Sequence, residues 1–171
     1  AAVAKGAIKA LSSFGWKVTN KEMRDGFAHT YWPGRLQKAT WNNKALLIDG
    51  AHNTHAMHQL SIEREKWENE SNGMKWIVGI QRNKQAPEML EHLIKPLDFA
   101  WIVPVPNHDC WKRSEIIGVL PQLQGQLKEE SSVDEVLSKL HRSKDWPLPI
   151  PVIAGSLYLI GELIEKEIIH I

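Results

Sequence analysis

Residues 46–57 read LLIDGAHNTHAM and contain the junction that decides the fold. An apolar run ends at Ile48, a polar loop covers residues 49–53, and a helical pattern begins at Thr54. A buried strand followed directly by a helix is the unit from which parallel sheets are built. Ligands of such sheets bind beyond the carboxyl ends of the strands, so this loop is the first candidate for a site.

The same alternation continues through the rest of the chain. IVGI at 77–80 and WIVPV at 101–105 are apolar throughout, as strands buried on both faces require. The predicted strands are Ala45–Ile48, Lys75–Ile80, Phe99–Val105, Gln126–Lys128 and Pro151–Ala154, and the predicted helices are Thr54–Asn69, Ala86–Leu97, Ser114–Leu120, Val133–Arg142 and Ser156–Ile169. We therefore expect an α/β fold, a mostly parallel sheet covered by helices on both faces.

The first 31 residues have a different pattern. Apolar residues recur at helical spacing from Val3 to Leu11, and TNKE at 19–22 is a capping box that starts a second helix. Trp-Pro-Gly at 32–34 then stops the helical pattern, because proline cannot continue a helix. The predicted boundary lies near Tyr31, with a two-helix segment over 1–31 and the α/β domain over 32–171.

Composition excludes several classes of protein. With 171 residues, 21 Lys+Arg against 20 Asp+Glu and a single Cys110, the chain can bury a core, has no overall basic field for nucleic acid and cannot form an internal disulfide. No stretch predicts a membrane span or a signal peptide, so we expect no membrane partner and a cytoplasmic protein. The chain starts at Ala1 rather than Met, and we expect it to be a piece of a longer protein.

Chemically active side chains gather in the loop at 49–53. Asp49, His52 and Asn53 follow a strand and precede a helix N-terminus, where free N–H groups attract anions. The alternative is that Asp49 or Asn53 only caps the helix. Arg35, just after the Trp-Pro-Gly corner, offers a guanidinium that suits phosphate or carboxylate, although an arginine after a turn is commonly a solvated surface group.

Other motifs carry weaker signals. His52, His55 and His58 have helical spacing, but no cysteine or carboxylate cluster completes a familiar ligand set, so we assign no metal site. The His108-Asp109-Cys110 loop has no base that the sequence can pair with it. Ser156 is a good helix N-cap, and no phosphate-cradling G-x-x-x-x-G-K-[ST] motif is present.

Three motifs taken together resemble a known family. YWPGRLQ at 31–37, LLIDGAHNTHAM at 46–57 and AGSLYLIGEL at 154–163 are similar to the carboxy-terminal part of folylpolyglutamate synthase and dihydrofolate synthase, members of the Mur ligase superfamily. GIQRNKQAPEML at 79–90 and VPVPNHD at 103–109 match the family pattern more loosely. The resemblance implies a Rossmann-like carboxy-terminal domain over 32–171, preceded over 1–31 by the last helices of a central ATP-binding domain.

The resemblance also implies roles for particular residues. Arg35 and Asp49 would contact ATP, His52 would be the functional, catalytic histidine, and Asn53 would bind beside the nucleotide or fix the loop. Lys84 is a weaker nucleotide-binding candidate, because the family commonly has a Lys-Asp pair there and this chain has Gln85 next. The family's ATP-contacting Asn at the start of its first helix is not found in the corresponding helix here.

The activity implied is ATP-dependent addition of L-glutamate to dihydropteroate, to a folate, or to both, through an acyl phosphate. The cofactors would be ATP and Mg²⁺, with the Mg²⁺ ligands in a central domain upstream that this chain lacks, so the chain alone would be inactive. The resemblance also favours a monomer. Two alternatives stay open: a cell-wall amino-acid ligase of the same superfamily, and a non-catalytic α/β module whose histidines hold a metal.

Overall fold

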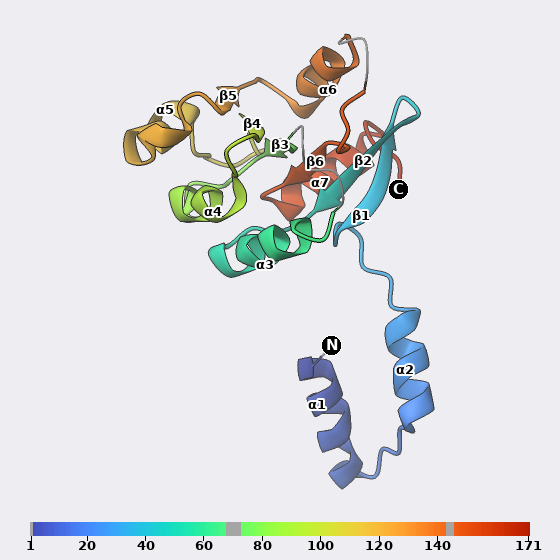
Figure 1. Ribbon diagram of the computed structural model, residues 1–171. Coiled ribbons are helices and arrows are strands. Elements are labelled where there is room, and N and C mark those ends of the chain that lie inside the picture. Colours follow the sequence, from blue (N-terminus) through green and yellow to red (C-terminus); the bar gives the residue numbers. More distant parts are fainter. Residues whose placement is uncertain (1, 68–72, 143–145) are drawn as a thin grey trace. The chain divides into compact units, whose positions relative to one another are not determined.

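The computed structural model describes residues 2–67, 73–142 and 146–171, which form two compact units, Ala1–Pro33 and Gly34–Ile171 (Figure 1). The first unit contains α1 (Ala2–Leu11), a 3-10 turn η1 (Ser12–Phe14) and α2 (Asn20–Ala28). The predicted capping box is confirmed, since the Glu22 N–H donates to the Thr19 hydroxyl while the Glu22 carboxylate accepts from the Thr19 N–H. In α1 no residue is buried, and in α2 only Met23 is.

The second unit contains a six-stranded sheet in the order β1-β2-β6-β3-β4-β5. Its strands are β1 (Gln37–Trp41), β2 (Lys44–Asp49), β3 (Lys75–Val78), β4 (Phe99–Ile102), β5 (Leu127–Glu129) and β6 (Val152–Ala154). β1 pairs antiparallel with β2, and every other pairing is parallel. The prediction of a mostly parallel sheet is confirmed.

Helices cover both faces of this sheet, as predicted (Figure 1). They are α3 (Thr54–Arg64), α4 (Ala86–Leu93) and α5 (Arg113–Val119) on one face, and α6 (Val133–Arg142) and α7 (Leu157–Glu165) on the other; the 3-10 turn η3 (Pro121–Leu123) follows α5. Successive side chains of a strand point to opposite faces, so Trp76 and Val78 enter the first core and Ile77 enters the second. All three are fully buried.

β1 is the strand that the sequence prediction missed. It forms a hairpin with β2 through Asn42 and Asn43, which have φ angles of 45° and 61°. Asparagine tolerates this left-handed region better than most residues, and two such residues form the tight turn that matches the twist of paired strands. The outer edge of β1 is in turn covered by the chain's end, where Thr40 and His170 exchange two backbone hydrogen bonds.

Several predicted elements are shorter in the structure. β3 ends at Val78 rather than Ile80, and β4 ends at Ile102 rather than Val105, near Pro104, which has no N–H to donate to a ladder. α4 ends at Leu93 because Ile94 is already extended, with ψ of 121°. α3 ends at Arg64, and the last predicted residues of that helix, 68–69, lie outside the described part of the chain.

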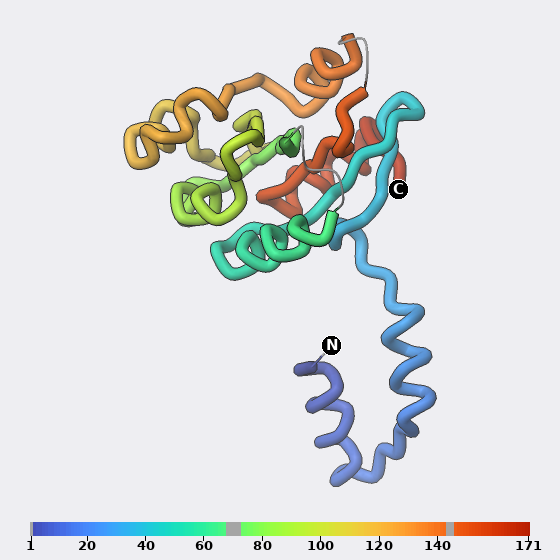
Figure 2. Tube along the Cα trace, in the orientation of Figure 1, coloured from blue at the N-terminus to red at the C-terminus, as the bar shows by residue number. Residues whose placement is uncertain are grey.

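The amino end of the sheet is held by a fully buried carboxylate. Asp98 pairs with Arg64 at 2.8 Å and also accepts hydrogen bonds from the Met74 and Lys95 N–H groups and the Trp76 indole. Figure 2 traces the path of the chain from β3 through α4 into β4, the strand that Asp98 precedes. Among the helices that the structure describes, none is long and apolar enough to cross a membrane.

Candidate functional site

The loop after β2 is built around the Asp49 carboxylate. One oxygen, Oδ1, accepts the Ala51 N–H at 2.8 Å, and the other, Oδ2, accepts the Leu36 N–H at 2.8 Å. Asp49 therefore fixes its own loop and also ties that loop to the turn that carries Arg35. Each carboxylate oxygen keeps a second lone pair that a ligand can use.

The turn before β1 brings Arg35 beside this loop. The Gly34 carbonyl accepts the Gly50 N–H at 2.6 Å, and the Gly34 N–H donates to the Gln37 side chain at 2.9 Å. The approach at Gly50 is close: a Cβ there would lie 2.2 Å from the Leu157 side chain, which would have to move, and 3.2 Å from the Gly34 carbonyl oxygen. Arg35 is exposed and makes no hydrogen bond or ion pair with any residue that the structure describes. Its guanidinium is therefore available to a ligand.

His52 is half-buried and held in one orientation. Its Nδ1 lies 2.7 Å from the Gly50 carbonyl oxygen, which can only accept. In the neutral ring the proton therefore sits on Nδ1, and Nε2 is left as an acceptor.

Asn53 is the N-cap of α3. Its side-chain oxygen accepts the Ala56 N–H at 2.8 Å, and its backbone is extended, as a capping residue requires. Asn53 therefore caps the helix, as one of the two interpretations of the sequence expects. A contact between Asn53 and nucleotide stays a prediction.

Lys84 reaches the same region from the loop after β3. It is half-buried, its N–H donates to the Gln81 carbonyl at 3.1 Å, and its own carbonyl accepts the Trp111 indole N–H at 2.8 Å. Gln85, where the family commonly has a carboxylate, makes no side-chain cap to α4.

A cavity of about 410 Å³ joins these loops. It is lined by residues from the ends of β2, β3 and β6: His52, Gln81, Asn83, Lys84, Gly155, Ser156, Leu157 and Tyr158. No lining residue is acidic, whereas a lysine, a histidine, two amides and two hydroxyls contribute to the wall. The lining chemistry suits an anion such as a carboxylate or a phosphate.

The topology explains why a cavity forms here. β3 continues into α4 on one face of the sheet, whereas the neighbouring β6 continues into α7 on the other face. The carboxyl ends of β3 and β6 are thus a topological switch point, where connections diverge and leave a crevice. Gly155, with φ of 102°, closes its floor, because a Cβ there would lie 2.5 Å from the Gly79 carbonyl oxygen.

The structure brings together some of the predicted residues and not others. His52 and Lys84 line the cavity, while Arg35, Asp49 and Asn53 belong to the adjoining turns. The sequence prediction assigned no ligand role to Gln81, Asn83, Ser156 or Tyr158. Their signal was available, since all four follow strand ends. Gln81 also has a buried side-chain nitrogen without a hydrogen-bond partner in the described part of the chain.

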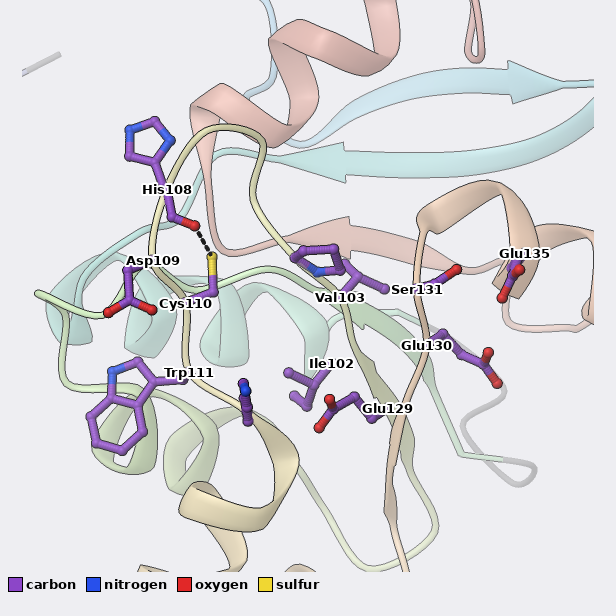
Figure 3. Close-up of a pocket in the computed structure, with 12 residues that line it drawn as sticks. Ile102, Val103, His108, Asp109, Cys110, Trp111, Glu129, Glu130, Ser131 and Glu135 are labelled. Atoms are coloured by element: carbon purple, nitrogen blue, oxygen red, sulfur yellow. Dashed lines mark hydrogen bonds between the residues drawn. The ribbon is translucent and has the colours of Figure 1, made fainter.

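A second cavity, of about 680 Å³, lies at the ends of β4 and β5 (Figure 3). Its lining includes Glu129, Glu130 and Glu135, so its charge is unsuited to phosphate. Two of these acids already have partners: Glu129 accepts the Arg113 N–H at 2.8 Å, and Glu130 pairs with Lys139 at 2.5 Å.

Cys110, which lines the second cavity, has a structural role. Its sulfur accepts the Val105 N–H at 3.1 Å and lies 3.3 Å from the His108 carbonyl, the contact dashed in Figure 3. Burial raises the pKa of the Cys110 thiol above its ordinary 9.0. A thiol that stays protonated is a poor nucleophile, so the geometry gives no support to a catalytic cysteine.

The histidines do not form a metal centre in the described residues. His52 precedes α3, and His55 and His58 are exposed on it. The His58 ring packs against His92 of α4, with ring centroids 5.1 Å apart. Within residues 2–67, 73–142 and 146–171, no three His, Cys, Asp or Glu side chains are placed to hold a metal ion.

Comparison with known proteins places this geometry in context. Residues 34–166 match the family model described as the dihydrofolate synthetase C-terminal domain. The chain is 30% identical over 144 residues to a folylpolyglutamate synthase of Lacticaseibacillus casei, covering 84% of this chain and 32% of that protein. The chain thus spans about a third of the length of this relative.

Solved structures share the fold. An Escherichia coli FolC in complex with DHPP and ADP superposes with a TM-score of 0.71 at 23% identity, covering 94% of this chain and 37% of that one. A bifunctional folylpolyglutamate synthase/dihydrofolate synthase from Yersinia pestis, complexed with AMPPNP and Mn ion, gives a TM-score of 0.68 at 18% identity, covering 89% and 35%. The family match, which spans the whole sheet with its helices, shows that this chain belongs to the dihydrofolate synthetase C-terminal domain family.

Proposed function

We propose that this chain is the carboxy-terminal lobe of an ATP-dependent ligase that adds L-glutamate to dihydropteroate, to a folate, or to both. The observation that carries the proposal is the cavity at the β3/β6 switch point, where His52 and Lys84 meet in a lining without acidic residues. Family membership and the names of the relatives, which are folylpolyglutamate and dihydrofolate synthases, support it.

The reaction forms an amide in two steps. A carboxylate oxygen of the pteroate or folate attacks the γ-phosphorus of ATP, the bond to the β,γ-bridging oxygen breaks, and ADP leaves. The amine of L-glutamate then attacks the acyl carbon, loses a proton, and inorganic phosphate leaves. Such steps gain most of their rate from alignment and from stabilisation of the developing negative charge.

The residues of this chain supply positive charge and orientation. Arg35, exposed and without a partner among the residues that the structure describes, would bind phosphate oxygens of ATP. Asp49 would accept from ribose hydroxyls with its remaining lone pairs, and through the Leu36 N–H it positions the Arg35 turn. Lys84 would hold an anionic oxygen in the cavity, and His52, with Nε2 as its acceptor, would bind or take the proton of a reacting group. Asn53 would hold α3 and its loop beside the nucleotide.

Mg²⁺ belongs to the proposal only as a partner of ATP, whose phosphate charge it neutralises. The described residues offer no three-ligand group for it, so its protein ligands would come from a central ATP-binding domain.

We propose that residues 1–31 belong to that central ATP-binding domain. Their two helices bury only Met23, and Val3, Phe14 and Trp16 are exposed. Packing against further protein would cover that apolar surface.

The test is ATP-dependent ligation of labelled L-glutamate by the longer protein that contains this chain, with dihydropteroate and tetrahydrofolate as separate acceptors. We expect product with at least one acceptor, with ADP released in equal amount, and none with this chain alone. If no labelled product forms with either acceptor, the folate assignment is refuted. Product with a cell-wall precursor instead would favour the related ligase class.

A further inference from the structure

The Lys84 loop does not stand free at the cavity rim, because the loop after β4 runs alongside it. The Arg82 N–H donates to the Asp109 carbonyl at 2.8 Å, and the Trp111 N–H donates to the Ile80 carbonyl at 3.0 Å. Between these two bonds Gln81 and Cys110 form an antiparallel bridge. The two loops are thus joined as a short ladder beyond the ends of their strands.

Trp111 extends this ladder to Lys84 itself. Its indole N–H donates to the Lys84 carbonyl at 2.8 Å, a side-chain bond to the backbone of a residue that lines the cavity. In Figure 3 Trp111 lies on the loop after β4, with its indole turned away from Glu130 and Glu135. A carbonyl fixed by an indole leaves the Lys84 backbone little freedom to move.

A second set of contacts fixes the indole. The Arg82 guanidinium lies 4.4 Å from the ring centroid of Trp111, and its Nη1 pairs with Glu115 at 2.5 Å. The Lys112 N–H, which donates to Glu115 at 3.0 Å, and the Arg82 charge together lower the pKa of that carboxyl. The ionised Glu115 carboxylate favours the placement of Arg82 over the ring.

We infer that Trp111 is a positioning residue, which sets the place of the Lys84 ammonium in the cavity through its indole hydrogen bond. Trp111 does not line the Lys84 cavity, so its effect on that cavity is indirect, through the Lys84 backbone. The effect on catalysis rests on the proposed function, whereas the effect on the loop does not.

The first test uses this chain and needs no activity. Trp111→Phe keeps an aromatic six-membered ring and removes the pyrrole part of the indole with its N–H, and the control variant removes the same atoms. Trp146→Phe is the matched control, because that indole also donates to a backbone carbonyl, that of Ala45 at 2.7 Å. We expect amide hydrogen exchange at residues 82–85 to become about 2- to 10-fold faster in the Trp111 variant, as one lost hydrogen bond implies, and to stay unchanged in the Trp146 variant. Unchanged exchange in both variants would overturn the inference.

The second test uses the longer ligase and a double-mutant cycle. Trp111→Phe should lower kcat/KM by about 2- to 10-fold, while Trp146→Phe leaves it unchanged. In a Lys84→Met background, Trp111→Phe should have almost no further effect, because it acts through Lys84. Fully additive losses would show that Trp111 acts by another route. A wild-type protein that forms no glutamate product would refute the proposed function, and the exchange measurement would still decide the loop inference.

Discussion

Asp98 at the amino end of the sheet and Asp49 at its carboxyl end differ in how completely the protein surrounds them. Asp98 has no exposed surface and accepts from one guanidinium, two backbone N–H groups and an indole. Asp49 is half-exposed and accepts two backbone N–H groups. The Asp98 carboxylate has no free lone pair left for a ligand. The Asp49 carboxylate keeps free lone pairs and lies between two loops that carry further candidate ligand-binding residues. The comparison separates a structural end of the sheet from a functional one.

The largest effect should come from breaking the structural end. Asp98→Ala removes the carboxylate that faces the buried Arg64 charge and the acceptor of three further hydrogen bonds, and we expect a loss of about 3–5 kcal/mol in the free energy of unfolding. Urea unfolding of this chain measures it. Asp134→Ala is the control: in the described part of the chain that exposed carboxylate accepts only the Trp41 indole, so the variant should lose about 0.5–1.5 kcal/mol. Equal losses of unfolding free energy in the Asp98 and Asp134 variants would contradict a special structural role for Asp98.

The second prediction concerns the functional end. Arg35→Ala should leave the free energy of unfolding within about 0.5 kcal/mol, because the side chain is exposed and has no partner in the described structure. In the longer ligase it should remove a charged hydrogen bond of about 1.5–3 kcal/mol, which lowers the efficiency of ATP use roughly 10- to 150-fold. Lys38→Ala, a nearby exposed cation, is the control. Wild-type kinetics in the Arg35 variant would remove that residue from the proposed site.

A third prediction separates the two roles given to Asn53. Asn53→Ala should destabilise this chain by about 1 kcal/mol through loss of the N-cap, as read by thermal or urea unfolding. Asn53→Asp keeps a capping oxygen and should leave stability nearly unchanged. If the aspartate variant also binds ATP more weakly in the longer ligase, Asn53 faces the nucleotide. Unchanged ATP binding would restrict it to the cap.

The smallest effect tests the second cavity, which carries Cys110. Because burial raises the pKa of this thiol, alkylation by iodoacetamide should begin at higher pH in the folded chain than in urea. The sign for stability follows: the folded state holds its proton longer, so the thiol's contribution is complete below pH 9.0 and declines as pH rises above it. Cys110 is the single cysteine, so mass spectrometry reads one site. Faster alkylation in the folded chain would contradict the structural role.

Most of the fold could be predicted from the sequence because the central strands β3, β4 and β6 are buried on both faces. Runs such as residues 76–78 are apolar on both faces, and helices with apolar residues at regular spacing lie between them, so the alternation is visible without coordinates. β1 was missed because it lies at the edge of the sheet. Its residues alternate between exposed and buried positions, and only the Asn42-Asn43 turn marks it as a hairpin.

The site was predicted in part, for a related reason. Asp49, His52 and Asn53 stand in one loop, so a local pattern exposes them together. Lys84 and Ser156 lie far away in the sequence and meet His52 only because β3 and β6 are neighbours in the sheet. No local pattern states that β6, the last strand, inserts between β2 and β3.

The sequence by itself determined the class of fold, the strand ends where polar residues follow apolar ones, and the motifs that mark the family, because each depends on residues close together in the chain. Only the tertiary structure decided which of these residues share a cavity, which carboxylate is saturated and which indole holds Lys84. Those properties depend on strand order and on hydrogen bonds between distant loops, which form only when the whole sheet is assembled.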